Sequence, residues 1–168
     1  MTKKKFGDKI YDYSEPEEEI IVALDFFKKN GVDKVLDLGC GTGRHIQFLR
    51  NQGFDVYGVD INKEIVKTSQ KKFGLDKILV GDMRQLHFSD KIFDAVIANQ
   101  VIYHGTKLDM IKAISEIYRV LCKGGLFFIT LQPRENQEWR MGKKLEDWTY
   151  IALAGPDKGD MHHFVDEV

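Results

Sequence analysis

The segment VLDLGCGTGRH, residues 35–45, constrains the fold more than any other part of the sequence. Its apolar residues 35–38 are predicted to form a short buried strand, and Gly39, Gly41 and Gly43 then follow at every second position. A helix-forming stretch comes next. Such a unit is typical of α/β domains that bind a dinucleotide, a phosphate group or another nucleoside. The glycine spacing and the surrounding residues must decide between these ligands.

The remainder of the chain repeats this alternation of strand and helix. Further strands are predicted at 55–59, 78–80, 93–98 and 126–131, from short runs rich in β-branched and aromatic residues. Short connections between such elements imply right-handed crossovers. The sequence therefore predicts one α/β domain over residues 1–168, with a doubly wound, mainly parallel Rossmann-like sheet and helices on both faces. Residues 1–14 are predicted to form a flexible tail.

Two helices have clear end signals. Ser14 is predicted to cap the first helix, with Pro16 in its first turn and Asn30-Gly31 at its end. A long helix is predicted after residue 98, ending at Gly124-Gly125. Its predicted buried stripe is Leu108, Ile111, Ile114, Ile117 and Leu121. Strand 126–131, LFFITL, is apolar on both faces, which is typical of a covered parallel strand.

The composition argues against several functions. A formal net charge of -1 over 168 residues gives no basic surface for a nucleic-acid backbone. Cys40 and Cys122 lack the spacing of zinc ligands, so no metal site is expected. The sequence shows no secretion signal and no run of the roughly 18 apolar residues that a membrane span needs. We therefore expect a cytoplasmic protein that binds neither membranes nor nucleic acid.

Polar or glycine residues follow four of the predicted strands. They are 37–43, Asp60, Gly81-Asp82-Met83 and Asn99-Gln100. In doubly wound sheets, ligands bind beyond the carboxyl ends of the strands, near the point where the strand order reverses. We therefore expect these residues to converge on one site.

The residues around the loop argue against two of the candidate ligands. A dinucleotide loop has the form GxGxxG, whereas here the spacing is GxGxG with Arg44 in the last position, and no GK[ST] of a phosphate loop follows. Asp37 would repel a pyrophosphate but suits an ammonium group, unless it merely bonds the loop amides. Asp60, about 20 residues after the loop, stands where a carboxylate accepts from ribose hydroxyls. Its alternative role is to cap the following helix.

In motif order over residues 35–131, the sequence resembles the class I S-adenosylmethionine-dependent methyltransferases. The family loop D/E-x-G-x-G-x-G is present at 37–43, the fourth motif as FDAVIANQVIYH at 93–104, and the fifth as EIYRVLCKGGLFFIT at 116–130. In the fifth, Cys122-Lys123 stands where Lys-Pro is common.

The resemblance implies S-adenosylmethionine as methyl donor and S-adenosylhomocysteine as product. In the family, the loop faces the methionine part, and the residues matching Asp60, Asp82 and the backbone of Met83 address the ribose, the adenine amino group and the ring. The implied cofactor contacts are Asp37, Gly39, Cys40, Gly41, Thr42, Gly43, Asp60, Ile61, Asp82, Met83, Asn99 and Tyr11.

The candidate catalytic residues are His104 and Tyr103, at the end of the fourth motif. His104 is the best candidate for a base or a substrate contact because an imidazole titrates near neutral pH; its alternative is a histidine bonded to backbone at a helix start. A base is needed only if the acceptor must lose a proton. Tyr11 is a candidate lid over the cofactor, or it packs on the first helix.

Residues 132–168, with Trp139, Trp148 and Tyr150, are predicted to cover the substrate side. His162 and His163, if in a strand, would point to opposite faces and so would not share a metal ion. HHFVDEV, 162–168, resembles the lead into another helix.

The family's sheet continues with a further helix and an antiparallel strand pair, for which this sequence has no room. A C-terminally truncated domain is therefore expected. Strand 126–131 would then expose an edge, through which we expect self-association.

The sequence thus favours a methyltransferase that acts on a small molecule. An RNA or protein methyltransferase with the same cofactor site, and a cofactor-binding but catalytically incomplete domain, are the alternatives. A nicotinamide-dependent oxidoreductase is least favoured because the third glycine is displaced.

Overall fold

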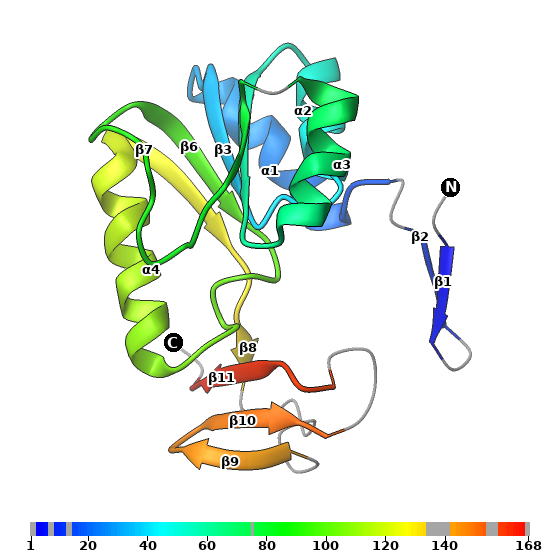
Figure 1. The fold of residues 1–168 in the computed structure, drawn as a ribbon. Helices are drawn as coiled ribbons and strands as arrows, with labels where there is room; N and C mark the ends of the chain where they lie inside the picture. Colours follow the sequence, from blue (N-terminus) through cyan, green and yellow to red (C-terminus); the bar gives the residue numbers. More distant parts are fainter. Residues whose placement is uncertain are drawn as a thin grey trace.

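The computed structural model has a five-stranded sheet flanked by helices, with two smaller groups of strands outside it (Figure 1). It describes residues 3–6, 9–12, 15–74, 76–133, 142–153 and 158–166. The elements are β1 (Lys3–Phe6), β2 (Lys9–Asp12), α1 (Glu18–Lys29), β3 (Lys34–Leu38), α2 (Arg44–Asn51), β4 (Asp55–Asp60), α3 (Lys63–Phe73), β5 (Ile78–Val80), β6 (Phe93–Ala98), α4 (Lys107–Val120), β7 (Leu121–Ile129), β8 (Gln132–Pro133), β9 (Gly142–Glu146), β10 (Thr149–Ala152) and β11 (Met161–Val165).

The central sheet runs in the order β5-β4-β3-β6-β7, and every neighbouring pair is parallel. The chain moves outward from β3 to β5 and then returns to place β6 on the other side of β3. The strand order therefore reverses between β3 and β6, which is where doubly wound sheets bind ligands. This arrangement confirms the predicted fold class.

The two faces of the sheet are covered by different helices. Helices α1, α2 and α3 bury Ile20, Ile46 and Val66 on one face, and α4 buries Met110 and Ile117 on the other (Figure 1). Successive residues of a strand point to opposite faces. Because helices cover both faces of the sheet, side chains on both faces of β3 are buried, and nearly all of them need to be apolar.

Helix α1 begins later than predicted. Its first residue is Glu18, and Glu17 occupies the N-cap position without a capping side-chain bond. Instead, Glu17 Oε1 accepts a hydrogen bond of 2.6 Å from Arg44 Nη2 at the start of α2. Ser14, the predicted cap, lies outside the described residues. The predicted end is confirmed, because Asn30 is the C-cap.

The predicted buried stripe of α4 is confirmed at Ile117 and Leu121 and is wrong at its other three residues. The helix buries Met110, Ala113, Ile117 and Val120, whereas Leu108, Ile111 and Ile114 are 59%, 48% and 37% exposed. We attribute the rotation of the helix to its polar side, where Glu116 and Arg119 bind the backbone of the loop that contains Leu86. Glu116 Oε2 accepts from Leu86 N at 2.6 Å, and Arg119 Nη2 donates to Leu86 O at 2.8 Å. In the described ranges, no helix is long and apolar enough to cross a membrane.

Strand β7 lies at an edge of the sheet, as the expected exposed edge of this strand predicts, but its faces are less covered than the apolar sequence indicates. Among the described strands it pairs only with β6. It begins directly after α4 and includes Gly124 and Gly125, which therefore do not end the helix as predicted. Phe127 is 45% exposed at this edge.

The segment after β7 contributes a four-stranded sheet in the order β8-β11-β10-β9, below the central sheet in Figure 1. Its β11–β10 and β10–β9 pairs are antiparallel. Residues 161–165 form strand β11, so the helix expected there is wrong over this range; its β-branched and aromatic residues favour extended structure. At the other end of the chain, β1 and β2 pair in antiparallel fashion where a tail without regular structure was expected.

Gly58 allows α2 to lie close to β4, and this contact gives a test of the packing. A Cβ atom at Gly58 would come within 2.6 Å of Ile46 Cδ1 and 2.9 Å of Cys40 Sγ. We expect Gly58→Ala to lower the free energy of unfolding by about 1–3 kcal/mol through overpacking. Ile46→Val removes the nearest atom and alone costs about 0.5–1.5 kcal/mol. Urea denaturation should therefore show a double variant less destabilised than the sum of the two single variants; strict additivity would contradict this packing.

Candidate active site

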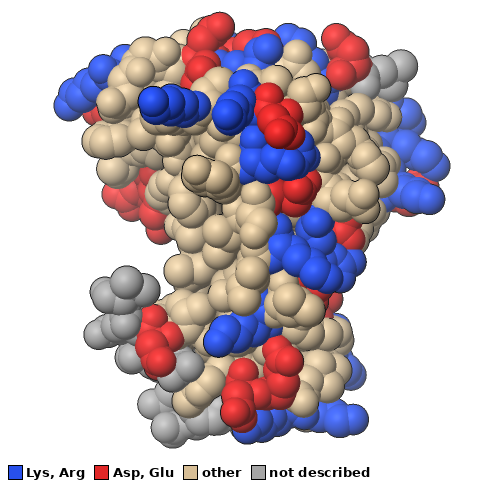
Figure 2. All heavy atoms as spheres, turned by 90° about the vertical axis from the view of Figure 1, so that its left-hand side faces the viewer, with Lys and Arg blue, Asp and Glu red and all other residues tan. Residues whose placement is uncertain are grey.

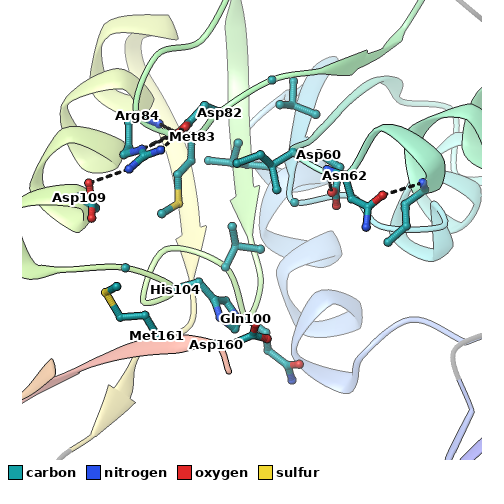
Figure 3. Close-up of a pocket in the computed structure, with 18 residues that line it drawn as sticks. Asp60, Asn62, Asp82, Met83, Arg84, Gln100, His104, Asp109, Asp160 and Met161 are labelled. Carbon is teal, nitrogen blue, oxygen red and sulfur yellow. Dashed lines mark hydrogen bonds and ion pairs between the residues drawn. The ribbon is translucent and has the colours of Figure 1, made fainter. Parts of the chain in front are cut away.

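A cavity of about 700 Å³ lies at the carboxyl ends of β3, β4, β5 and β6, at the point where the strand order reverses (Figure 3). Its lining residues are Leu38, Gly39, Val59, Asp60, Ile61, Asn62, Ile65, Gly81, Asp82, Met83, Arg84, Gln100, Val101, His104, Gly105, Asp109, Asp160 and Met161. The volume falls in the range of small-molecule sites, about 300–1,000 Å³.

The first glycine of the loop is required by a close approach. Gly39 has φ +71°, and a Cβ atom there would lie 2.2 Å from Val101 Cγ2. Gly41, with φ +53°, has open space at its Cβ position and donates its N–H to Asp60 Oδ2 at 2.9 Å. Gly43 serves packing instead, because its Cβ position is filled by the Phe73 ring. The loop thus presents its backbone to the cavity at Gly39.

Asp37 is buried within β3, just before the first glycine of the loop. It is 1% exposed, and its Oδ2 has no hydrogen-bond partner among the described residues. Nδ1 of the buried His45 lies 3.8 Å from Asp37 Oδ1, beyond hydrogen-bond distance. An unsatisfied buried carboxylate oxygen costs free energy unless a ligand donates to it. The alternative role, in which Asp37 bonds the loop amides, has no such bond in the structure to support it.

Asp60 is held in place by two main-chain donors. Its Oδ2 accepts from Gly41 N and its Oδ1 from Asn62 N, each at 2.9 Å. Each carboxylate oxygen has about two acceptor sites, so one on each oxygen stays open. The cap of α3 is Asn62, whose Oδ1 accepts from Glu64 N and Ile65 N. Asp60 therefore does not cap α3, because Asn62 occupies the cap position.

Asp82 forms an ion pair with Arg84, which also reaches the first turn of α4. Arg84 donates from Nε to Asp82 Oδ1 at 2.9 Å and from Nη1 to Asp109 Oδ1 at 3.1 Å (Figure 3). Hydrogen bonds from the Arg84 side chain lower the pKa of Asp82. Hydrogen bonds from the backbone and hydroxyl of Thr106, followed by those from Arg84, lower the pKa of Asp109 to about 2. Both carboxyl groups are therefore ionised at neutral pH.

The rim of the cavity opposite Asp82 and Arg84 is built from the loop after β6 and the start of β11 (Figure 3). Gln100 has φ +56°, a strained conformation for a residue other than glycine, and its N–H donates to Thr130 Oγ1. The His104 and His162 rings lie 4.6 Å apart between centroids, and the Tyr103 ring lies 4.7 Å from His104. Gly105 N donates to Met161 O at 3.0 Å, so β11 is bound to this rim.

The structure brings some of the predicted site residues to the cavity and leaves others outside it. Those that line it are Gly39, Asp60, Ile61, Asp82, Met83 and His104. Those that do not are Asp37, Cys40, Gly41, Thr42, Gly43, Asn99 and Tyr103. Burial raises the pKa of the Cys40 thiol far above its usual range, and Sγ packs against Gly58, so the side chain is not available to a ligand. The side chain of Tyr11 and the whole of Trp139 lie outside the described residues.

Several lining residues were not found from the sequence. Arg84 follows Asp82 by two residues, and Thr106-x-x-Asp109 is a capping-box pattern, confirmed by mutual hydrogen bonds. Both patterns are visible in the sequence and could have identified Arg84 and Asp109 as candidates. Asp160 and Met161 carry no local signal, because they reach the cavity only through the placement of β11.

Comparison with known proteins identifies the family. Residues 36–129 match the family described as methyltransferase domain. The chain is 35% identical over 142 residues to the putative methyltransferase YqeM of Bacillus subtilis, covering 77% of this chain and 58% of that protein. It is 30% identical over 149 residues to 24-methylenesterol C-methyltransferase 2 of Arabidopsis thaliana, covering 83% of this chain and 39% of that protein.

A solved S-adenosylmethionine-dependent methyltransferase from Clostridium acetobutylicum has the same fold, with a TM-score of 0.73 at 19% identity over 94% of this chain and 76% of that chain. The chain thus belongs to the class I S-adenosylmethionine-dependent methyltransferases, as its motif order predicts. It spans 58% or less of the length of the first curated relatives it matches.

The residues present fit S-adenosylmethionine, the cofactor of this family. Asp37 offers a buried acceptor without a partner to an ammonium group, and Asp60 keeps two open acceptor sites for a pair of hydroxyls. Apolar side chains of Ile61 and Met83, which follow Asp60 and Asp82 in the chain, line the same cavity and suit an adenine ring.

The lowered pKa of Asp109 predicts a pH-dependent contribution to stability. Its folded pKa of about 2 lies below the unfolded value of about 3.9, so the contribution is complete above pH 4 and is lost as the pH falls towards 2. We expect Asp109→Asn to lower the free energy of unfolding by about 1 kcal/mol at pH 7. In urea denaturation at decreasing pH, the difference from wild type should shrink below pH 4. Asp90→Asn, at a carboxylate 68% exposed, serves as control; a difference that stays constant to pH 2.5 would contradict the assignment.

Proposed function

We propose that this protein transfers a methyl group from S-adenosylmethionine to a small-molecule acceptor. The observation that carries this proposal is the convergence of Gly39, Asp60 and Asp82, from three separate strand ends, on one cavity where the strand order reverses. Membership of the methyltransferase family supports the same reaction.

The proposed cofactor contacts follow from the chemistry of each residue. The Asp37 carboxylate binds the ammonium group, and the backbone of residues 39–43 lies along the methionine part. Asp60 accepts from the two ribose hydroxyls through its open sites. Ile61 and Met83 enclose the adenine ring, and Asp82 accepts from its amino group. Asn99, whose Nδ2 has no hydrogen-bond partner in the described part of the chain, donates to the cofactor's carboxylate.

The acceptor end of the cavity is proposed to be the rim formed by Gln100, His104, Asp160 and Met161. When bound, S-adenosylmethionine supplies an already electrophilic methyl group, so the chain has mainly to orient the acceptor and exclude water. His104 lines the cavity and is placed to hold or take the acceptor's proton. Tyr103, 5% exposed, supports the imidazole ring from behind and does not line the cavity.

The segment after β7 is proposed to cover the acceptor side as part of a single domain. Asp160 and Met161 line the cavity, and His163 N donates to Tyr103 O at 2.8 Å. Residues that bind an acceptor usually lie in such connecting segments on a rigid sheet. The cytoplasmic location stays a prediction from the sequence.

A small molecule is favoured over RNA as acceptor by charge. Four aspartates, Asp60, Asp82, Asp109 and Asp160, line the cavity with only one guanidinium, and the net charge of the chain is -1. A polyanion would be repelled there. One relative is a sterol methyltransferase, which supports a small acceptor. Another, the probable tRNA methyltransferase 9B of Mus musculus, is 35% identical over 111 residues and supports the RNA alternative.

We propose in addition that two copies associate through the edge strand β7. Its outer main-chain groups have no strand partner among the described residues, and a second β7 would satisfy them. Large apolar side chains are exposed on both elements of this side, Phe127 on β7 and Leu108 and Ile111 on α4. Figure 2, which faces this side of the molecule, shows uncharged surface between groups of charged residues.

Binding and substitution at Asp60 test the proposed cofactor site. Titration calorimetry should show that S-adenosylhomocysteine binds and that NAD does not. Asp60→Ala removes both ribose hydrogen bonds and should weaken binding by about 100-fold or more, because each bond to a charged acceptor is worth about 1.5–3 kcal/mol. Asp55→Ala, at the other end of β4, is the control and should leave the dissociation constant unchanged. Binding of NAD alone, or an unaltered constant in Asp60→Ala, would overturn the proposal.

Light scattering tests the association. We expect a dimer at tens of micromolar, within the concentration range where weak interfaces of about 8 kcal/mol form. Phe127→Lys should convert it to a monomer by placing a charge at the shared edge. Val22→Lys, at a residue 70% exposed on α1 and so across the sheet, should have no effect. A monodisperse wild-type monomer would contradict the association.

A further inference from the structure

Arg84 makes an unusually complete set of hydrogen bonds to Asp82. Its main-chain N–H donates to Oδ1 at 2.8 Å, Nε donates to Oδ1 at 2.9 Å and to Oδ2 at 3.0 Å, and Nη2 donates to Oδ2. Figure 3 shows the pair at one corner of the cavity, with Met83 between them along the chain. One residue therefore fixes the position and the plane of the Asp82 carboxylate.

The number of acceptor sites that Arg84 fills determines what Asp82 can still bind. An ionised carboxylate has about four lone-pair sites, two on each oxygen. The planar guanidinium takes one site on each oxygen in the bidentate arrangement, and the main-chain N–H takes a further one on Oδ1. The single Nε–H is shared between the two oxygens and lies slightly closer to Oδ1, so three N–H groups occupy three of the four sites and leave about one, on Oδ2. Asp82 is thus prepared to accept a single N–H from a ligand.

The guanidinium is held at its other end as well. Arg84 Nη1 donates to Asp109 Oδ1 at 3.1 Å, and Asp109 Oδ2 accepts from Thr106 N and Thr106 Oγ1 at 3.0 and 2.8 Å. Asp109 is therefore fixed to the first turn of α4 by its capping box. Because both ends of its guanidinium are occupied, Arg84 cannot rotate without breaking bonds to two carboxylates.

We propose that Arg84 determines specificity for the adenine base of the cofactor, by leaving Asp82 a single fixed acceptor site that matches an exocyclic amino group. This rests on the proposed role of Asp82. A base that presents a carbonyl oxygen at that position, such as hypoxanthine, places two acceptors against each other there. Its ring N–H could be satisfied only by a carboxylate that is free to turn, and Arg84 prevents that turn. Arg84 is on this view a positioning residue, which acts through Asp82.

A plain surface ion pair would behave differently. The Arg84 and Asp82 side chains are 44% and 32% exposed, and exposed pairs contribute little to stability. If the pair had only that role, its loss would leave base discrimination unchanged. Discrimination between two ligands therefore separates the two explanations where a stability measurement would not.

The test compares S-adenosylhomocysteine with S-inosylhomocysteine, which differs at the position of the amino group, by titration calorimetry. In the wild type we expect the adenine ligand to bind about 10- to 100-fold more tightly, the value of one hydrogen bond to a charged acceptor. Arg84→Gln should reduce this ratio by about tenfold or more. Arg84→Lys should reduce it as well, because an ammonium group keeps the charge but cannot form the bidentate fork.

A matched control is provided by Arg119, which also connects the loop before β6 to carboxylates of that region. It donates to Glu116 and Asp90 and to Leu86 O, but it does not line the cavity. Arg119→Gln should leave the ratio unchanged. Circular dichroism melting shows whether each variant is folded. Because the Arg84 side chain is 44% exposed, we expect both Arg84→Gln and Arg84→Lys to fold, which gives two independent comparisons.

The outcomes separate this inference from the proposed function. If Asp82→Asn abolishes the ratio while Arg84→Gln and Arg84→Lys keep the wild-type value, Asp82 reads the base and the role of Arg84 is overturned. If Asp82→Asn keeps the wild-type ratio while S-adenosylhomocysteine still binds, the assignment of Asp82 to adenine fails, and with it this inference, although the cofactor site stands. If neither ligand binds the wild type, the proposed function itself fails.

Discussion

The end of strand β3 is fixed by two hydrogen bonds, and the position of the site depends on them. Gly39 N and Cys40 N both donate to Val59 O, at 2.7 and 3.0 Å, so the chain leaves the sheet where β4 also ends. A side chain at Gly39 would overlap Val101, which β6 brings to the same place. The central strand, its two neighbours and the loop therefore meet within a few residues of one another. Every other group of the cavity is placed relative to this junction.

The fold, and the part of the cavity at the ends of β3, β4 and β5, could be predicted because their signals are local. Each strand of the parallel sheet is a short apolar run, and a run buried on both faces has few alternatives to a strand. Asp60 and Asp82 follow their strands directly, so the rule that parallel strands end at one edge is enough to bring them together. The glycine spacing located the loop, because a side chain at Gly39 would overlap Val101 and a side chain at Gly43 would overlap Phe73.

Apart from His104, the rest of the cavity and the outer surfaces could not be predicted, because they depend on contacts between distant residues. The rotation of α4 is set by Glu116 and Arg119, which bind a loop about 30 residues earlier. An apolar stripe in the sequence shows that a helix is amphipathic but not which of two apolar flanks faces the sheet. Met161 reaches the cavity because backbone hydrogen bonds join β11 to the loop after β6, from Gly105 N to Met161 O and from His163 N to Tyr103 O. Such pairings leave no periodic pattern in the sequence.

The polar groups of the site fall into two sets that differ in how the protein itself satisfies them. At the ends of β4 and β5, Asp82 is held by three N–H groups of Arg84, and Asp60 by two main-chain donors. Near the loop, Asp37 Oδ2 and Asn99 Nδ2 are buried without hydrogen-bond partners in the described residues. An unsatisfied buried group costs about 1–3 kcal/mol, and a ligand that supplies its partner recovers this energy. One of these groups is an acceptor and the other a donor, which is the combination that an ammonium and a carboxylate group would satisfy together. The rigid end is therefore suited to selecting the base, and the incomplete end to gaining affinity from the amino-acid part of the proposed cofactor.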